Sequence, residues 1–387
     1  MATYKTIKYI VPVEVVEHTD SINALADVDT STASPTEGQT IKWDGTNWVP
    51  GDIKAFVSGV QKAIFGFGRA NGNTNVTNLV SSTGVVATDT TGVGTARELL
   101  AAAGYGGDKA IFGFGYTYSS SPYERNMTNL VSNVGVVASD TTGVGSARQR
   151  VAAAGYGGDK AIFGFGYGSG TGFPGDTRPA RTSMTNLVSN TGVVASDTTG
   201  VGTARTAPAA AGYGSGKAIF GFGQTGSGST SVTNLVSNTG VVASDTTGVG
   251  VSRYSLAATN YGGDKAIFAF GGHSSPKTNT NSYNGNTYIN NYYSDDKSDK
   301  ICLVSNTGVV ASDTTGVGTA RIFPSAAGYG GDKAIFGFGR TSGDTYYIQT
   351  LTNFTNLVSN TGVIASHTYG VGAARVAQAA ASYSTTA

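Results

Sequence analysis

A short apolar run recurs along most of the chain. Residues Lys109–Gly115 form the run Lys-Ala-Ile-Phe-Gly-Phe-Gly, and closely similar runs begin at Lys62, Lys160, Lys217, Lys265 and Lys333. Successive copies begin 47, 51, 57, 48 and 68 residues apart. A period of about 50 residues is typical of tandem repeat proteins, so we interpret the repeat before any single residue.

Each repeat contains four strand-length runs separated by turn residues. In the second copy these runs are Ala101–Gly106, Lys109–Gly115, Thr128–Val131 and Gly135–Ala138. The connections at Gly106–Asp108 and Ser132–Gly135 are short, so consecutive strands are expected to pair antiparallel. Four antiparallel strands in a repeat of this length predict one blade of a β-propeller.

The second strand of the repeat has no polar face. Strand alternation predicts Ala110, Phe112 and Phe114 on one face and Ile111, Gly113 and Gly115 on the other. Both faces must then be covered, as they are when a blade lies between two others. Because glycine weakens a strand, its recurrence indicates the close approach of another element. We expect each phenylalanine ring to lie over the glycine face of the adjacent blade.

The two ends of the repeat region are complementary. The copy at Lys62 is preceded by residues 53–61, which lack the Ala-Ala-Ala-Gly-Tyr strand, whereas Ala374–Tyr383 is a first strand with no second strand after it. We therefore predict an all-β fold in which residues 57–387 form a six-bladed β-propeller closed by the C-terminal strand. Closure removes the open edge between the first and last blades, whereas a solenoid needs dissimilar capping repeats.

The phasing of residues 62–383 supports the same architecture. Each repeat has an arginine before its first strand, an apolar second strand ending in Phe-Gly-Phe-Gly or a close variant, and two further strands. This order resembles kelch repeats, whose propellers often close with a C-terminal first strand. The double glycine that ends the kelch second strand occurs only at Gly271–Gly272, and the kelch tryptophan of strand four is absent. The resemblance therefore implies an architecture and no particular partner.

Residues 1–56 differ from the repeats and are predicted to be a small β-rich attachment or oligomerisation segment. The runs Ile41–Trp43 and Asn47–Val49 flank Asp44–Gly45, and an Asp-Gly pair between short β-prone runs is a strong hairpin signal. A segment this short makes a poor core alone. We expect a partner to complete it, through self-association or docking on a larger assembly.

A second resemblance lies within residues 25–50. It is carried by Leu25–Asp29, Pro35, Glu37–Gly45 and Trp48–Pro50. Together these runs look like a short module common in fibre and appendage proteins of tailed phages. The resemblance implies a virion protein that is assembled in the host cytoplasm and contacts other virion proteins through residues 1–56. We also expect a homo-oligomer.

Charge and composition exclude several classes of function. The chain has 25 Lys and Arg against 24 Asp and Glu, so nucleic-acid or anionic-membrane binding is not expected. Its Gly, Ser, Thr and Asn content resembles a low-complexity linker, but the apolar residues recur in register. The single cysteine, Cys302, excludes an internal disulfide. The three histidines form no metal-ligand pattern, no run approaches membrane-spanning length and no signal peptide is evident. We expect no metal, cofactor or membrane insertion.

The candidate binding surface is the set of inserts between the second and third strands. These inserts vary widely between repeats, and a rigid scaffold that carries divergent loops is a common way to build a binding surface. Tyrosine among Ser, Gly and Asn offers rigid contacts and adaptable hydrogen bonds, which suit sugar rings and hydroxyls. The candidate ligand-binding residues are Tyr118, Tyr123, Tyr283, Tyr288, Tyr292, Tyr293, Tyr346 and Tyr347. In the alternative interpretation, the inserts pack on each other or on a neighbouring subunit and bind nothing.

Six arginines recur at the connection from the fourth strand to the next first strand. They are Arg97, Arg148, Arg205, Arg253, Arg321 and Arg375. Eight residues before them lie Asp89, Asp140, Asp197, Asp245, Asp313 and, in the sixth place, His367. A ring of arginines can bind an anion, but a residue repeated in every blade is typically structural. We interpret these arginines as a structural ring, paired with aspartate or with loop carbonyls.

The sequence contains no catalytic constellation. Enzymes on this kind of scaffold need clustered carboxylates, a nucleophile and base, or metal ligands, and the local cluster Asp295, Asp296 and Asp299 is explained by a solvated loop. We predict a non-enzymatic structural protein of a tailed-phage virion, in a tail or capsid fibre or appendage, whose propeller attaches to host-surface glycans. The alternatives are an architectural decoration protein without a ligand, and a bacterial cell-surface lectin, which the missing signal peptide disfavours.

Overall fold

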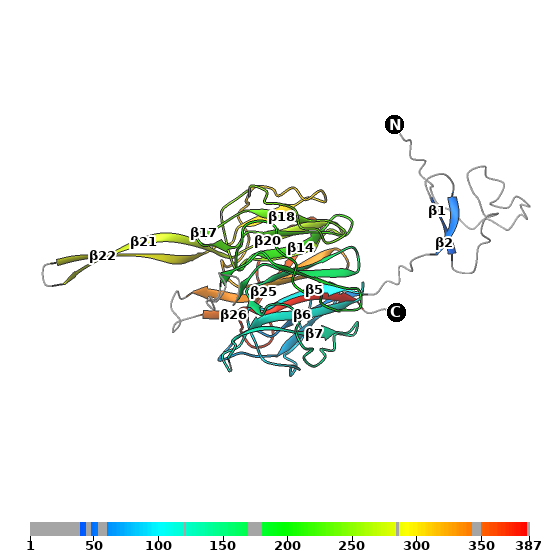
Figure 1. Ribbon diagram of the computed structural model, residues 1–387, viewed down its shortest axis with the longest axis horizontal. Helices are drawn as coiled ribbons and strands as arrows, with labels where there is room; N and C mark the ends of the chain where they lie inside the picture. The colour runs from blue at the N-terminus through cyan, green and yellow to red at the C-terminus, as the bar shows by residue number, and fades with distance from the viewer. Residues whose placement is uncertain are drawn as a thin grey trace, which may run out of the picture. The chain divides into compact units, whose positions relative to one another are not determined.

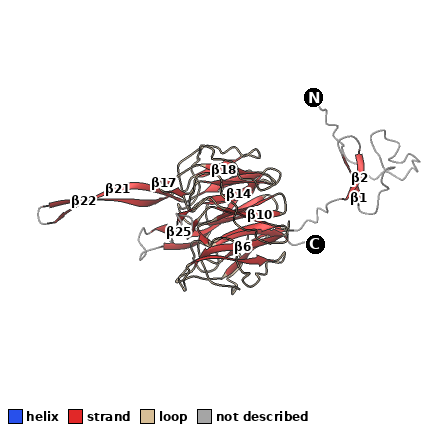
Figure 2. Cartoon of the chain, viewed as in Figure 1, coloured by secondary structure: helices blue, strands red, loops and turns tan. Residues whose placement is uncertain are grey.

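The protein consists of β-strands throughout its described residues. The computed structural model describes residues 39–43, 48–52, 60–119, 121–168, 180–283, 286–342 and 350–384; for 39–43, 48–52, 275–283 and 286–295 it describes the backbone alone. These ranges contain no helix, and their strands all pair antiparallel (Figures 1 and 2), which confirms the all-β prediction. The chain divides into two compact units, Met1–Ser58 and Gly59–Ala387.

The first unit contains the hairpin expected from the sequence. Strand β1 (Gln39–Trp43) pairs antiparallel with β2 (Trp48–Asp52), and Trp43 lies opposite Trp48 in the register. The Leu25–Asp29 part of the phage-like module lies outside the described residues. The hairpin therefore supports only the strand assignment in this segment.

A three-stranded arrangement of one design recurs six times in the second unit: five copies are separate sheets, and the copy in the second repeat belongs to a six-stranded sheet. In each copy the second strand is central, with the first strand on one side and the third on the other. The first strands are β5 (Ala101–Tyr105), β9 (Ala152–Tyr156), β14 (Ala209–Tyr213), β19 (Ala257–Tyr261), β24 (Ser325–Tyr329) and β27 (Ala379–Ser384). The second strands are β3 (Gln61–Gly66), β6 (Lys109–Tyr116), β10 (Lys160–Gly164), β15 (Lys217–Gly221), β20 (Lys265–Ala269) and β25 (Lys333–Ser342). The third strands are β4 (Thr77–Val80), β7 (Glu124–Val131), β13 (Thr185–Val188), β18 (Thr233–Val236), β23 (Ile301–Val304) and β26 (Thr350–Val358).

Short strands in the inserts and connections extend this framework. They are β8 (Arg148–Gln149), β11 (Tyr167–Gly168), β12 (Ala180–Arg181), β16 (Gln224–Thr225) and β17 (Gly228–Ser229). Strands β8, β11 and β12 join the outer side of the second sheet, next to β7. Isolated bridges such as Glu98–Tyr116 and Ile322–Arg340 join the connection before each first strand to the start of the insert between the second and third strands. The connections and inserts therefore lie together, as strand direction predicts.

The first repeat takes its first strand from the end of the chain. Strand β27 pairs antiparallel with β3, with Ala379 opposite Gly66 and Tyr383 opposite Lys62, which confirms the predicted exchange. The six first strands contact one another in the order β27, β5, β9, β14, β19, β24 and back to β27. Backbone hydrogen bonds follow the same cycle. The N–H groups of Gly106, Gly157, Gly214, Gly262, Gly330 and Ser384 donate to the carbonyls of Asp159, Gly216, Asp264, Asp332, Gln61 and Asp108, respectively.

The fourth run of each repeat is not a regular strand. It forms only two isolated bridges with the third strand; in the second repeat these are Val131–Val137 and Thr128–Thr141. Between them the side-chain amide of Asn129 donates to the Ala138 carbonyl at 3.0 Å and to Asp140 Oδ1 at 2.9 Å. A side chain that bonds the backbone in this way competes with the ladder. The prediction of four strands per repeat is therefore wrong: each repeat has three strands and a bridged segment.

A left-handed phenylalanine interrupts the second strand of each repeat. Phe114 has a φ of 65°, and the register of β6 with β7 shifts across it. Phe112 contacts Phe67 of the preceding repeat, whereas Phe114 contacts Phe163 of the following repeat, each at 5.1 Å between ring centroids. The prediction that Phe112 and Phe114 share a face is wrong, because a β-bulge reverses the alternation beyond it.

The glycine before this bulge lies beneath an aromatic ring of the next repeat. A Cβ placed on Gly113 would lie 2.7 Å from the Phe163 ring, and four other repeats have the same arrangement. This confirms that each ring packs on the glycine of an adjacent repeat. In the fifth repeat the glycine is replaced by Ala269, and the rings of Phe270 and Phe336 lie 5.5 Å apart, against 5.1 Å for Phe114 and Phe163.

We expect Gly113→Ala to lower the free energy of unfolding by about 1–3 kcal/mol, because the added methyl forces the Phe163 ring out of a packed core. The control is Ala269→Gly, where the rings already lie farther apart and the loss should be about 1 kcal/mol or less. Chemical denaturation midpoints measure both. An unchanged midpoint for Gly113→Ala would contradict this packing, because the Phe163 ring would then have space for the added methyl group.

Candidate functional site

The six repeated arginines are fully buried, each with an exposed fraction of 0%. The Arg97 guanidinium lies over the Phe67 ring, 4.4 Å from its centroid. Its Nε donates to the Phe114 carbonyl at 2.8 Å and its terminal nitrogen donates to Asn129 Oδ1 at 2.7 Å. Equivalent cation–π contacts involve the other five arginines. These guanidinium groups therefore present no exposed surface of their own to a large ligand.

In five of the six repeats, the aspartate that faces the arginine follows the third strand of the same repeat and is not the one eight residues before the arginine. Asp140 Oδ1 lies 3.7 Å from a terminal nitrogen of Arg97, and Asp140 Oδ2 accepts hydrogen bonds from Thr95 N and Thr95 Oγ1 at 2.9 and 2.7 Å. At the other end of the chain, Arg375 lies 3.2 Å from Asp89. The contact therefore ties the connection that enters a repeat to the segment after that repeat's third strand, and Arg375 makes it between the C-terminal part of the chain and the first repeat.

We call each such trio a lock. The six trios are Arg97–Asn129–Asp140, Arg148–Asn186–Asp197, Arg205–Asn234–Asp245, Arg253–Cys302–Asp313, Arg321–Asn356–His367 and Arg375–Asn78–Asp89. The repeated arginine and aspartate are visible in the sequence. Their partnership is not, because it depends on how the connection before the first strand packs against the segment after the third strand.

The carboxylate and the guanidinium of a lock both stay charged at neutral pH. Burial raises the pKa of the Asp140 carboxyl, but hydrogen bonds from Thr95 and Asn129 outweigh it and leave this pKa below its usual value. The pKa values of Asp89, Asp197 and Asp245 are lowered by the same balance. Burial lowers the pKa of Arg97, Arg148 and Arg205 to about 10. These arginines therefore remain cationic at neutral pH.

The lock predicts loss of stability in acid. A carboxyl whose pKa is lower in the folded state stabilises the fold above its unfolded pKa of 3.8 and loses this contribution as the pH falls through the folded pKa. We expect the Tm to fall by roughly 5 °C or more between pH 5 and pH 3. Calorimetry measures the slope, and Asp140→Asn should flatten it. An unchanged slope in that variant would contradict the contribution of this carboxylate.

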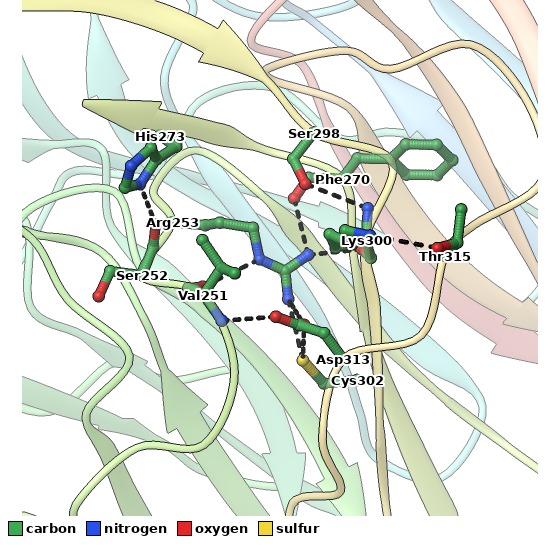
Figure 3. A network of polar contacts seen from close by, with 10 residues as sticks. All are labelled: Val251, Ser252, Arg253, Phe270, His273, Ser298, Lys300, Cys302, Asp313 and Thr315. Atoms are coloured by element: carbon green, nitrogen blue, oxygen red, sulfur yellow. Dashed lines mark hydrogen bonds and ion pairs between the residues drawn. The ribbon is translucent and has the colours of Figure 1, made fainter. Parts of the chain in front are cut away.

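The fifth lock replaces the asparagine by Cys302 (Figure 3). Arg253 donates to Cys302 Sγ and to Asp313 Oδ1, each at 2.9 Å, and the thiol donates to Asp313 Oδ1 at 2.7 Å. Burial raises the pKa of Cys302 to about 12, and a protonated buried thiol is a poor nucleophile. The sulfur therefore takes the structural place of the amide.

The longest insert forms a two-stranded ribbon. Strands β21 (Gly272–Tyr283) and β22 (Asn286–Lys297) pair at twelve positions, and Figure 1 shows them running away from the repeats. Tyr288 lies opposite Asn281, Tyr292 opposite Lys277 and Tyr293 opposite Pro276. Because alternate residues share a face, positions 283, 288 and 292 lie on one face of the ribbon and position 293 lies on the other.

The remaining candidate tyrosines belong to other inserts. Tyr118 and Tyr123 are 47% and 46% exposed, and both rings contact Tyr116, at 4.9 and 5.8 Å between centroids. They form an exposed aromatic cluster in the second repeat. Tyr346 and Tyr347 lie outside the described residues. The eight tyrosines therefore come from three separate inserts.

Sequence analysis missed a cavity at the hairpin end of the first strands. It measures about 330 Å³ and is lined by Lys109, Lys160 and Lys217 among glycines and the buried tyrosines of the first strands. Lys109 and Lys160 form ion pairs with the aspartates before them, whereas Gly216 precedes Lys217. The Ala- and Gly-rich first strands could have indicated an open centre, since small side chains leave space between converging strands.

Neither the models of known protein families nor the curated proteins contain a match to this chain. Among the described residues no group of three His, Cys, Asp or Glu side chains could hold a metal ion. The same residues include no helix long and apolar enough to cross a membrane.

Proposed function

We propose that this chain is a non-enzymatic structural protein of a tailed-phage virion, in which a six-bladed kelch-like β-propeller is presented for attachment to host-surface glycans. Residues 1–56 would hold the chain to other virion proteins. Support for the virion assignment comes from the phage-like module at residues 25–50. Support for a display role comes from the connections between strands. The short hairpins between the first and second strands are similar wherever they occur, whereas the inserts between the second and third strands differ widely.

Closure of the propeller is part of the proposal. Three observations support it: β27 pairs with β3, the six first strands contact one another in a cycle, and Arg375 faces Asp89 across the two ends of the repeat region. A cycle of antiparallel sheets joined in this way leaves no unpaired repeat at either end. Small-angle scattering of the full chain and a crystal structure would test it.

The β21–β22 ribbon is the observation that carries the binding proposal. Its strands contain four of the eight candidate tyrosines among Asn, Ser and Thr, a composition suited to amphipathic contacts with sugars. The exposed cluster of Tyr118 and Tyr123 is a second aromatic surface.

The binding proposal is tested on the full chain by glycan-array and whole-cell binding. The variant replaces residues 272–300 with the short insert 224–232, and the matched control is Tyr118→Ser with Tyr123→Ser, which leaves the ribbon intact. Loss of binding in the folded ribbon variant alone is expected. Equal binding by the wild type and the ribbon variant would contradict a receptor site on the ribbon.

One observation favours the architectural alternative. Among the described strands neither β21 nor β22 pairs with a third strand, and an isolated two-stranded ribbon is only marginally stable. Residues 278–294 contain no charge and no proline, although natural proteins commonly place such residues on open strand edges. A ribbon of this kind suits pairing with a neighbouring subunit. A smaller oligomer for the ribbon variant in mass photometry, without any glycan binding by the wild type, would favour this alternative.

A further inference from the structure

The lock of the sixth repeat lacks the carboxylate that the other five locks contain. In the second repeat Asp140 accepts hydrogen bonds from Thr95 N, Thr95 Oγ1 and Asn129 Nδ2, at 2.9, 2.7 and 2.9 Å, and faces Arg97. The carboxylates of Asp89, Asp197, Asp245 and Asp313 accept equivalent hydrogen bonds. His367 occupies this position in the sixth repeat.

His367 does not replace the carboxylate as an acceptor for the whole set of donors. Its ring stacks on Phe354 at 4.4 Å between centroids, and its Nδ1 lies 3.5 Å from Thr319 Oγ1. The backbone N–H of Thr319, which corresponds to the Thr95 N–H, makes no hydrogen bond among the described residues. The carboxylate position of the sixth lock therefore keeps its donors and lacks their acceptor.

The other two donors, the Asn356 amide and the Arg321 guanidinium, each make one long contact in addition to a shorter hydrogen bond. The Asn356 amide nitrogen lies 3.4 Å from the Val317 carbonyl, in place of the 2.9 Å bond from Asn129 to Asp140, although it also donates to Ala365 O at 2.9 Å. A terminal nitrogen of Arg321 lies 3.4 Å from Thr319 O. These distances are at the limit of useful hydrogen bonding. Both groups have capacity for a better acceptor.

Arg321 is also a buried cation without a counter-ion. Its exposed fraction is 0%, and it makes no ion pair with the described carboxylates. Its other terminal nitrogen donates to Asn356 Oδ1 at 2.7 Å, and its Nε has no hydrogen-bond partner. Burial lowers the pKa of Arg321 to about 9, so it stays charged at neutral pH. Burial of an uncompensated charge is unfavourable, so an anion that reached this group would stabilise the fold.

We propose that the sixth lock binds a small monovalent anion, chloride or a short carboxylate, in place of the missing aspartate. Thr319 N–H, the Thr319 hydroxyl, the Asn356 amide and the Arg321 guanidinium are its donors. Each of the five intact locks holds one carboxylate at this position. The ligand is therefore expected to be of similar size and to carry a single negative charge. The equivalent carboxylates of the intact locks are partly exposed: Asp140, Asp245 and Asp89 are 28%, 30% and 32% exposed, and Asp313 is 11% exposed. A small anion can therefore enter from solvent at the corresponding position.

The test is thermal unfolding of the full chain during chloride and acetate titrations at constant ionic strength, balanced with the bulkier isethionate. We expect the Tm to rise by about 2 °C and to saturate, as binding to the folded state requires. A larger rise with acetate would identify a carboxylate ligand, and a larger rise with chloride a halide. A Tm independent of both anions would overturn the proposal.

Two variants separate a specific site from a general salt effect. His367→Asp supplies the missing carboxylate, so its Tm should be higher without added anion and should lose the anion-dependent rise. Asp140→Ala creates a second vacant lock, and its Tm should rise more steeply with the anion than that of the wild type. Anomalous scattering from bromide-soaked wild-type crystals locates the ion. Bromide elsewhere, or an unchanged anion dependence in both variants, would contradict the assignment to Thr319 and Arg321.

Discussion

A chain that ends at Gln378 will not show the cooperative unfolding transition of the full-length protein. The deletion removes β27, whose Ala379, Ala381 and Tyr383 side chains are buried against the first and second repeats. It leaves the β3 backbone unpaired on one side and exposes the Phe112 core. We expect a loss comparable with the whole stability of a typical domain, about 5–15 kcal/mol, and aggregation through the open edge.

A circularly permuted chain is the control for this deletion. It begins with residues 371–384, joined to Gln61 through the Gly-Gly-Asp turn that links β5 to β6, and ends at Gly370. The first repeat then receives the same strand from a local hairpin. Calorimetry should show a single transition for the permuted chain and none for the truncated one. A truncated chain that kept the wild-type Tm would show that β27 contributes little.

Arg205→Met is expected to lower the free energy of unfolding by about 3 kcal/mol. Breaking a buried ion pair on one side leaves the other partner uncompensated, at a cost of about 3–5 kcal/mol, and here Asp245 is partly solvated, with a side chain 30% exposed. The variant also loses hydrogen bonds to Phe222 O and Asn234 Oδ1, each 2.7–2.8 Å long. Urea denaturation followed by circular dichroism measures the loss.

The matched control for this substitution is Arg321→Met. The sixth lock has no carboxylate, so removal of its guanidinium strands no anion, and replacement of an unpaired buried cation by an apolar side chain can be nearly neutral. In chloride-free buffer the loss for Arg321→Met should therefore be much smaller than for Arg205→Met. Equal losses would mean that the hydrogen bonds, and not the ion pair, account for the effect.

The recurrence and order of the apolar runs predict most of the strand framework. The Lys-Ala-Ile-Phe run forms the central strand of every repeat, and the unpaired first strand at the C-terminus joins β3. Both inferences depend on local runs and on which strand lacks a neighbour, and such information is present in the sequence. The hairpin at Trp43 and Trp48 was found in the same way.

The features that sequence analysis missed depend on tertiary packing. Phe114 adopts a left-handed backbone that strand propensity disfavours, and it does so because its ring fills a space against Phe163. The Arg97–Asp140 contact joins residues that are far apart in the sequence, so the nearer Asp89 was an equally good candidate from sequence. The ribbon at β21 and β22 lacks an apolar face, and its polar residues gave no strand signal.

The position of β3 has a mechanical consequence. The described second unit begins at Val60, directly before Gln61, so a tension applied through the preceding residues enters the repeats at the end of β3. Because β27 comes from the far end of the chain, β3 is a central strand, bonded on one side to β27 and on the other to β4. Pulling along β3 loads two hydrogen-bonded ladders in shear at once, instead of peeling an edge strand bond by bond. A protein tethered through its N-terminal segment would thus carry load at the point where the first and last strands of the repeat region pair.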